Sequence, residues 1–288
     1  MTLWIARISW AVLPLTAGQL AADSVAGWSS ATGTTAVVLL WLGWIVTLVA
    51  LFAPRPVGLT ALRIIAPTFA VTAVVAAANP RSSTLVVVVG VATTLFAAVF
   101  ALSRPVARCA IDSNSWGDEQ RYPLRIPPAL IASLVPLAVA IVAAVIAAVP
   151  LLFAAGNGLW ALVVLVLGGP AAALLIRSLH SLTRRFLVLV PAGLVISDPI
   201  TLADPVLFPR ERIARVERVD PRAVTMIETL DARAGSLLVT IAVTFTDPAS
   251  VVIAARGGTA EMIEIRHLLV APCEPNAFFE RARARRLV

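Results

Sequence analysis

Six apolar windows fill most of the first 177 residues, and they constrain the fold more than any other feature of this sequence. A helix needs about 20 apolar residues to cross the hydrocarbon core of a bilayer. The whole chain has 59% hydrophobic and only 14% charged residues, which lies outside the range of soluble proteins. We therefore predict an α-helical polytopic membrane bundle over residues 1–177, with about six transmembrane helices at 5–22, 35–53, 60–78, 84–102, 129–149 and 159–176.

The first window is the weakest, because Arg7, Pro14 and Gln19 interrupt it. Three interpretations stay open: a spanning helix, a cleaved signal peptide and a helix that lies in the membrane interface. The uninterrupted apolar run lasts only from residue 8 to residue 15, and no clear Ala-x-Ala cleavage site follows it. The pattern favours a spanning helix.

The distribution of arginine predicts the orientation, because basic residues are retained on the cytoplasmic side of spanning helices. All 23 basic residues are arginine, which is typical of a GC-rich bacterial genome. With six spans, only Arg81 lies on the side opposite the N-terminus. We expect a multi-pass protein of the bacterial inner membrane with both termini in the cytoplasm, since ten arginines share the N-terminal side: Arg7, Arg55, Arg63, Arg104, Arg108, Arg121, Arg125, Arg177, Arg184 and Arg185.

One long polar loop, residues 103–128, separates the fourth and fifth windows. Its carboxylates, arginines and aromatic rings could form the acid, base and phosphate clamp of a lipid-modifying enzyme at headgroup level. The alternative is a cytoplasmic loop whose aromatic residues anchor the interface and whose ions pair or stay solvated, or that docks against the C-terminal domain. The candidate loop-site residues are Trp116, Asp118, Glu119, Arg121, Tyr122 and Arg125.

A basic junction, residues 178–185, leads into a region at 186–288 where the periodicity changes from helical to alternating. The alternation is clearest over residues 237–245, which predicts a half-buried strand. Residues 191–193 and four Asp-Pro pairs predict turns, and residues 275–286 predict a closing helix. Other strands are expected at 186–190, 194–197, 205–208, 213–219, 224–230, 251–255 and 262–270, and together they predict an antiparallel barrel or sandwich.

The hairpin-like stretch from Arg184 to Asp198 and the ending Pro272-x-x-Pro275-x-Ala277-Phe278 resemble the first hairpin and terminal helix of a known family. That family comprises bacterial membrane proteins with a pleckstrin-homology-like (PH-like) cytoplasmic domain. The resemblance implies a mostly-β PH-like barrel capped by a helix, and a role in binding lipids or protein partners rather than catalysis.

Motifs for catalysis and cofactor binding are absent from the sequence, including Gly-x-Ser-x-Gly, the P-loop, dinucleotide glycine runs, His-Glu-x-x-His and Cys-x-x-Cys. We therefore expect no catalytic, metal or cofactor-binding residues and no cofactor. The last 111 residues carry fourteen arginines and twelve acids. This near balance argues against nucleic acid as a partner.

These observations favour a membrane scaffold or adaptor that presents the PH-like domain to proteins or to inner-leaflet lipids. A transporter or channel subunit for an uncharged or lipidic substrate is one alternative, and a lipid-modifying enzyme that uses the 103–128 loop is another. The sequence identifies neither the partner nor the oligomeric state, and it leaves open whether the bundle encloses a transport cavity. Candidate contacts with anionic headgroups or partners are Arg177, Arg184, Arg185, Arg281, Arg283, Arg285 and Arg286.

Overall fold

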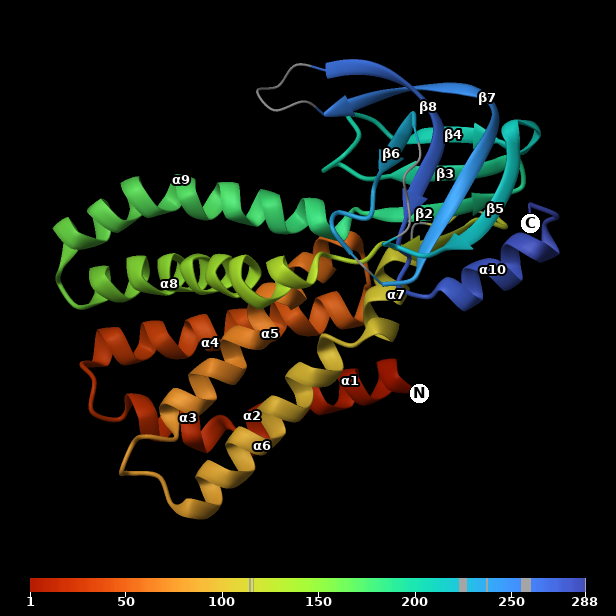
Figure 1. Ribbon diagram of the computed structural model, residues 1–288. Coiled ribbons are helices and arrows are strands. Elements are labelled where there is room, and N and C mark those ends of the chain that lie inside the picture. The colour runs from red at the N-terminus through yellow and green to blue at the C-terminus, as the bar shows by residue number, and fades with distance from the viewer. Residues whose placement is uncertain (114, 116, 223–226, 237, 255–259, 288) are drawn as a thin grey trace. The chain divides into compact units, whose positions relative to one another are not determined.

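The computed structural model of the protein describes residues 1–113, 115, 117–222, 227–236, 238–254 and 260–287 (Figure 1). The chain forms two compact units. The first contains Met1–Ser113 and Val135–Leu179, and the second contains Asn114–Leu134 and His180–Val288. We call them the membrane unit and the β domain.

Five helices are long and apolar enough to cross a membrane. They are α4 (Ser30–Phe52), α5 (Pro56–Ala76), α6 (Thr84–Ala101), α8 (Val135–Ala154) with the turns before it from Pro128, and α9 (Gly158–Thr183). Large apolar side chains such as Leu162 and Val166 are exposed on them, as expected of surfaces that contact lipid. The predicted windows from 35 to 176 correspond to these helices, and five such helices are compatible with a multi-pass membrane protein.

The first window is not one long helix. It folds as three consecutive short helices, α1 (Thr2–Ala11), α2 (Leu13–Thr16) and α3 (Gly18–Val25). Pro14 lies in the first turn of α2, where its missing N–H costs least, and Gly18 begins α3. Because these breaks divide the segment, it does not belong to the five long helices.

The membrane unit nevertheless packs this segment into its core. Trp10 is fully buried, and its indole Nε1–H donates to the backbone oxygen of Trp44 at 3.2 Å, while Trp44 Nε1–H donates to the backbone oxygen of Trp10 at 2.9 Å. Gly90 of α6 lies so close to Leu20 that a Cβ would approach the leucine to 2.9 Å. After α6, the short amphipathic helix α7 (Arg104–Asp112) buries Val106, Ala110 and Ile111.

The β domain contains two four-stranded sheets. The first has the order β1-β2-β3-β4 and is antiparallel throughout. The second has the order β5-β7-β8-β6, with β6 parallel to β8 and the other pairs antiparallel. The strands are β1 (Gln120–Pro123), β2 (Phe186–Val190), β3 (Gly193–Ser197), β4 (Val206–Pro209), β5 (Ile213–Val219), β6 (Thr229–Asp231), β7 (Thr240–Ala254) and β8 (Ala260–Val270).

One hydrophobic core serves both sheets and helix α10 (Pro275–Ala284). Phe208 of the first sheet stacks on Phe245 of the second, with ring centroids 4.5 Å apart. Phe278 of α10 meets Tyr122 of β1 edge to face at 5.4 Å. The predicted strands at 186–190 and 213–219 match β2 and β5 exactly in their bounds, and the terminal helix is confirmed.

The structure differs from the prediction at several places in the β domain. The arrangement was predicted to be antiparallel, but β6 pairs with β8 in parallel. The strand expected at 224–230 lies partly outside the described residues, which contain a strand only from Thr229 to Asp231. Asp247-Pro248 does not end a strand, because β7 continues through it with a shift of register between Thr244 and Ala249, an irregularity that accommodates a proline. The strand expected to begin at 237 begins at Thr240. Among the described residues the strand pairs form two separate sheets and not one closed barrel.

Candidate functional site

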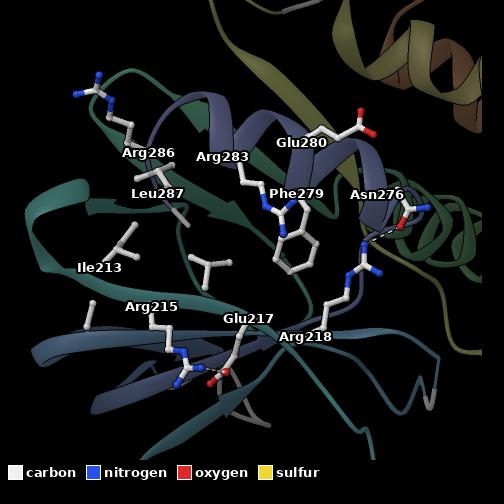
Figure 2. A pocket seen from close by; sticks show the side chains of 12 residues that line it. Ile213, Arg215, Glu217, Arg218, Asn276, Phe279, Glu280, Arg283, Arg286 and Leu287 are labelled. Atoms are coloured by element: carbon white, nitrogen blue, oxygen red, sulfur yellow. Dashed lines mark hydrogen bonds and ion pairs between the residues drawn. The ribbon is translucent and has the colours of Figure 1, made fainter.

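A groove of about 810 Å³ lies between strand β5 and helix α10 of the β domain (Figure 2). It contains apolar, basic and acidic side chains, with more arginines than glutamates. We call it the β5–α10 groove, and its lining residues are Ile213, Ala214, Arg215, Val216, Glu217, Arg218, Asn276, Phe279, Glu280, Arg283, Arg286 and Leu287.

Strand β5 supplies one wall with six consecutive residues, 213–218. Successive side chains of a strand point to opposite faces of its sheet. Val216 is accordingly buried in the core while Arg215 is exposed, yet both line the groove. Since side chains from both faces take part, the groove runs along the edge of β5. This edge is unpaired in the described residues, where β5 pairs only with β7.

Helix α10 supplies the opposite wall. It begins at Pro275, which suits the first turn of a helix because proline lacks an N–H. Phe278, Phe279 and Ala282 are buried on one face, which fixes the helix against the domain core. That packing places Glu280 and Arg283 on the exposed side of the helix, and Arg283 points towards β5 in Figure 2.

Two polar contacts organise the groove. Arg218 donates from Nη2 to Asn276 Oδ1 at 2.6 Å, and its guanidinium lies 4.8 Å from the ring centroid of Phe279. These contacts tie the end of β5 to the first turn of α10. Arg215 and Glu217, two residues apart on one face of β5, form an ion pair at 2.9 Å. This pairing largely neutralises Glu217.

Arg283 and Arg286 complete the basic side of the groove. Both are exposed, and neither side chain makes a hydrogen bond or ion pair within the part of the chain that the structure describes. Arginine presents planar donors that suit carboxylates, so these two positions favour an acidic ligand. Chemically, the groove offers strand-edge backbone groups, an apolar floor and cationic donors at the α10 side.

The structure brings together only part of the predicted basic set. Arg283 and Arg286 both line the groove, but only Arg283 points into it in Figure 2 and Arg286 points away, whereas Arg285 donates to the backbone oxygen of Asp118 and Arg281 is half-buried. Arg184 is exposed at the start of the β domain. Arg177 is also exposed and belongs to the membrane unit.

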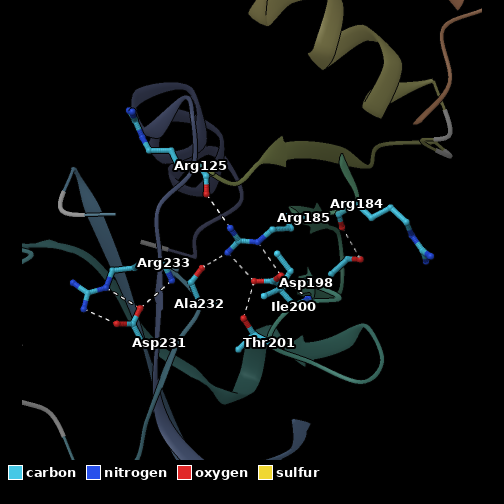
Figure 3. Close-up of polar contacts among 10 residues, drawn as sticks. Arg125, Arg184, Arg185, Asp198, Ile200, Thr201, Asp231, Ala232 and Arg233 are labelled. Carbon is cyan, nitrogen blue, oxygen red and sulfur yellow. Dashed lines mark hydrogen bonds and ion pairs between the residues drawn. The ribbon is translucent and has the colours of Figure 1, made fainter. Parts of the chain in front are cut away.

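Arg185 was expected to contact headgroups, and that prediction is wrong. Its side chain is completely buried and bonds to Asp198 through two contacts, Nε to Oδ1 at 2.8 Å and Nη2 to Oδ2 at 2.9 Å (Figure 3). It also donates to the backbone oxygens of Arg125 and Ala232. A guanidinium used in this way holds the domain together and is not available to a lipid.

Most of the candidate residues of the 103–128 loop make structural contacts within the β domain. Tyr122 is not an interfacial anchor, because it lies in the core of the β domain with 2% of its surface exposed. Glu119 and Arg121 form an ion pair at 3.5 Å, and Arg125 donates from Nε to the backbone oxygen of Pro272 at 3.3 Å. Asp118 is exposed in a turn, and Trp116 lies outside the described residues. Of the three uses considered for this loop, docking against the C-terminal domain is the one that the strand pairing of β1 with β2 supports.

Sequence reasoning missed the β5 wall of the groove. The strand itself was predicted, but its arginines and Glu217 were not singled out. No local signal marks a strand as an edge, because the order of strands depends on pairing between distant segments. Asn276 and Phe279 were likewise identified only as part of the closing helix expected at 275–286.

Within the described ranges, no group of three or more His, Cys, Asp and Glu side chains could hold a metal ion. Comparisons of the chain with protein-family models, curated proteins and solved structures returned no match.

Proposed function

We propose that the protein is a membrane scaffold or adaptor of the bacterial inner membrane. In this proposal six spans anchor a cytoplasmic PH-like domain, which is presented to protein partners or inner-leaflet lipids. The observation that carries the proposal is the β5–α10 groove, an accessible recognition surface on a domain joined to a multi-pass anchor. A groove with an unpaired strand edge and cationic rim is equipped to bind and not to catalyse.

The contacts of the first segment support a sixth span. Arg7 of α1 donates from Nε to the backbone oxygen of Leu51, at the end of α4. Asp23 of α3 accepts a hydrogen bond from the hydroxyl of Ser82, in the turn between α5 and α6. Leu51 lies just before α5 and Ser82 just after it, so the two contacts are at opposite ends of α5. Helices α1–α3 therefore extend from one end of the membrane unit to the other.

The β domain is built from two separate segments of the chain, which supports placing the 103–128 loop and the C-terminus on the same side of the membrane. Strand β1 comes from that loop, yet it pairs with β2 after helix α9. The loop and the C-terminal segment must share a compartment for this pairing to form. Because α8 and α9 lie between them in the chain, they would cross the membrane and return as a pair. The arginine distribution favours the cytoplasm as that compartment.

Backbone contacts between the two sheets support the PH-like fold. An isolated bridge joins Leu124 to Pro272, and another joins Leu202 to Ile253. Arg125 N–H also donates to the backbone oxygen of Ala271 at 2.8 Å. These contacts tie the sheets at two corners, and α10 packs on the shared core. Two tied sheets and a C-terminal helix match the plan of the PH-like domain.

Cysteine labelling tests the topology. Single cysteines at Thr2, Ser30 and Ala203, in a background with Cys109→Ala and Cys273→Ala, are exposed to a membrane-impermeant maleimide in intact cells. We expect labelling at position 30 alone, and labelling at 2 and 203 only after permeabilisation. Labelling at position 2 in intact cells would leave five spans, and labelling at 203 would invert the orientation.

Crosslinking in living cells tests the scaffold role. A photoreactive amino acid replaces Arg283 in the groove, and the matched control replaces Ala203, which is exposed outside the groove. We expect adducts from position 283 that contain a second protein or a lipid and are much weaker at 203. Equal or absent adducts at the two positions would contradict the proposed function.

A further inference from the structure

Resting on the proposed function, we propose that the β5–α10 groove binds an extended acidic segment of a partner protein. The segment pairs with the unpaired edge of β5 and becomes an additional strand of the sheet β5-β7-β8-β6. Its acidic side chains contact Arg283, which points into the groove.

The strand edge determines the backbone of the ligand. In an antiparallel pair, alternate residues direct their N–H and C=O groups to the partner strand, and the residues between them direct theirs away. Strand β5 has seven residues, and among the residues that the structure describes it pairs only with β7, on one side. It therefore presents a row of alternating donors and acceptors along the groove. Only another extended polypeptide matches that row.

Helix α10 keeps this edge accessible. Its buried residues Phe278 and Ala282 hold it against the core, and Arg218 bridges to it through Asn276 at one end of the groove. The helix thus stands beside the strand without pairing to it, since a helix has no backbone groups to spare except at its ends. The space between them is the volume of about 810 Å³.

The charges of the groove determine the side chains of the ligand. Four arginines and two glutamates line it, so its net charge is positive. Arg215 already pairs with Glu217, while Glu280 points away from the strand in Figure 2. Arg286 also points away from the strand, so Arg283 is left as the cation that faces a ligand in the groove. Ile213 and Leu287, both half-buried, offer apolar contact between the charges. A segment that alternates acidic and apolar residues fits this pattern.

A lipid headgroup fits the groove less well. A phosphate group is held best by several donors that converge on one point. Arg218 is engaged by Asn276 and the ring of Phe279, and Arg215 is engaged by Glu217 on the opposite face of β5. The cationic groups are spread along the groove, which favours a linear ligand.

Peptide selection on the full chain tests the proposal. The protein is reconstituted in nanodiscs of phosphatidylcholine and used to select from a phage library of random eight-residue peptides. We expect enrichment of sequences rich in Asp and Glu, with alternating apolar residues and without proline. Hydrogen exchange with a selected synthetic peptide should protect the amides of residues 213–219.

Charge reversal and backbone methylation make the test specific. Arg283→Glu should weaken binding of the selected peptide by about tenfold or more, because like charges then face each other. The matched control Arg222→Glu changes an exposed arginine outside the groove lining and should leave the affinity within about twofold. Two further peptides carry N-methyl groups at alternate residues, one at the odd positions and the other at the even positions. One of them should lose binding and the other should keep it, since only one set of N–H groups faces β5.

Several results would overturn the proposal. The first is a selection that enriches no acidic peptides. The second is binding of both methylated peptides, and the third is protection from hydrogen exchange at amides outside β5 and α10. Nanodiscs with phosphatidylglycerol are the lipid arm: if they protect residues 213–219 without peptide, the groove contacts the membrane surface instead. If crosslinks from position 283 still contain a second protein while the peptide arm fails, the scaffold function stands and strand addition is wrong.

Discussion

The substitution Asp198→Asn removes the negative charge from the buried pair with Arg185 and keeps the size of the side chain. Both side chains are completely buried. The amide can still accept a hydrogen bond, as can the backbone oxygens of Arg125 and Ala232, but the guanidinium charge loses its counterion. The variant therefore isolates the electrostatic part of this interaction.

The expected loss of stability is large. Breaking a buried ion pair by removing one partner costs about 3–5 kcal/mol, because the remaining charge stays buried without compensation. Asp198 also accepts from the backbone N–H of Ile200 at 3.2 Å and from the hydroxyl of Thr201 at 3.0 Å, so the turn after β3 loosens too. The total stability of a domain is only about 5–15 kcal/mol. A loss of this size leaves the β domain marginal.

Hydrogen exchange on the full chain measures the effect. At about 1.4 kcal/mol for each factor of ten, 3–5 kcal/mol lowers the protection of amides in β2 and β3 by about two to four powers of ten. The matched control is Asp231→Asn, which breaks the partly exposed pair of Asp231 with Arg233 and should cost about 1 kcal/mol or less. Protection in Asp198→Asn within about threefold of the unsubstituted protein would refute the reasoning.

Three further changes probe the β domain. Phe278→Ala empties the contact with Tyr122 and should destabilise the domain by about 3–5 kcal/mol, measured by thermal melting of the full chain. An unchanged melting curve would mean that α10 does not stabilise the core. Gly193→Ala should cost at least about 1–3 kcal/mol in the same assay, because φ is +150° and a Cβ would lie 2.1 Å from the backbone oxygen of Phe208. Burial alone would raise the pKa of Asp231, but the hydrogen bonds and charge of Arg233 outweigh it and lower that pKa. A lowered pKa contributes stability above the unfolded value of about 3.9, which is lost as pH falls through the folded value. The melting difference between Asp231→Asn and the unsubstituted protein should therefore be present at pH 7 and shrink below about pH 4, and a difference that grows in acid would contradict this sign.

The sequence predicts the elements of this protein better than their assembly. Apolar windows and alternation are local signals, which explains why the five long helices, β2, β5 and α10 were predicted, although the ends of the long helices differ by up to seven residues. The breaks at Pro14 and Gly18 were visible, but whether helices separated by them still traverse a bundle depends on packing. Trp10 and Trp44 exchange their hydrogen bonds between segments 34 residues apart.

In the candidate site, too, the sequence predicts local features but not how they assemble. Arg283 and Arg286 were identified because an arginine-rich helix end is visible in the sequence, yet Arg185 belongs to a similar cluster and is buried. Its partner Asp198 is 13 residues away across the β2–β3 hairpin. Exposure separates a binding arginine from a structural one, and exposure is set by strand pairing that no short motif encodes.

The origin of β1 makes the folding of the β domain depend on a segment that precedes helices α8 and α9 in the chain. Tyr122 and Leu124 lie in the same core as Leu187 and Leu189, although helices α8 and α9 separate them in the chain. Residues 180–288 alone would lack this strand and expose the core beside β2. Losing one large buried side chain such as Tyr122 costs about 3–5 kcal/mol, a large part of a domain's stability. We expect residues 180–288 expressed alone to be unfolded or aggregated. Fusing residues 117–127 to them through a Gly-Ser linker should restore a dispersed amide NMR spectrum, and a Tyr122→Ala version of the fusion is the matched control. A dispersed spectrum from residues 180–288 alone would show that the loop strand is dispensable, and the pairing of β1 with β2 would no longer constrain the topology.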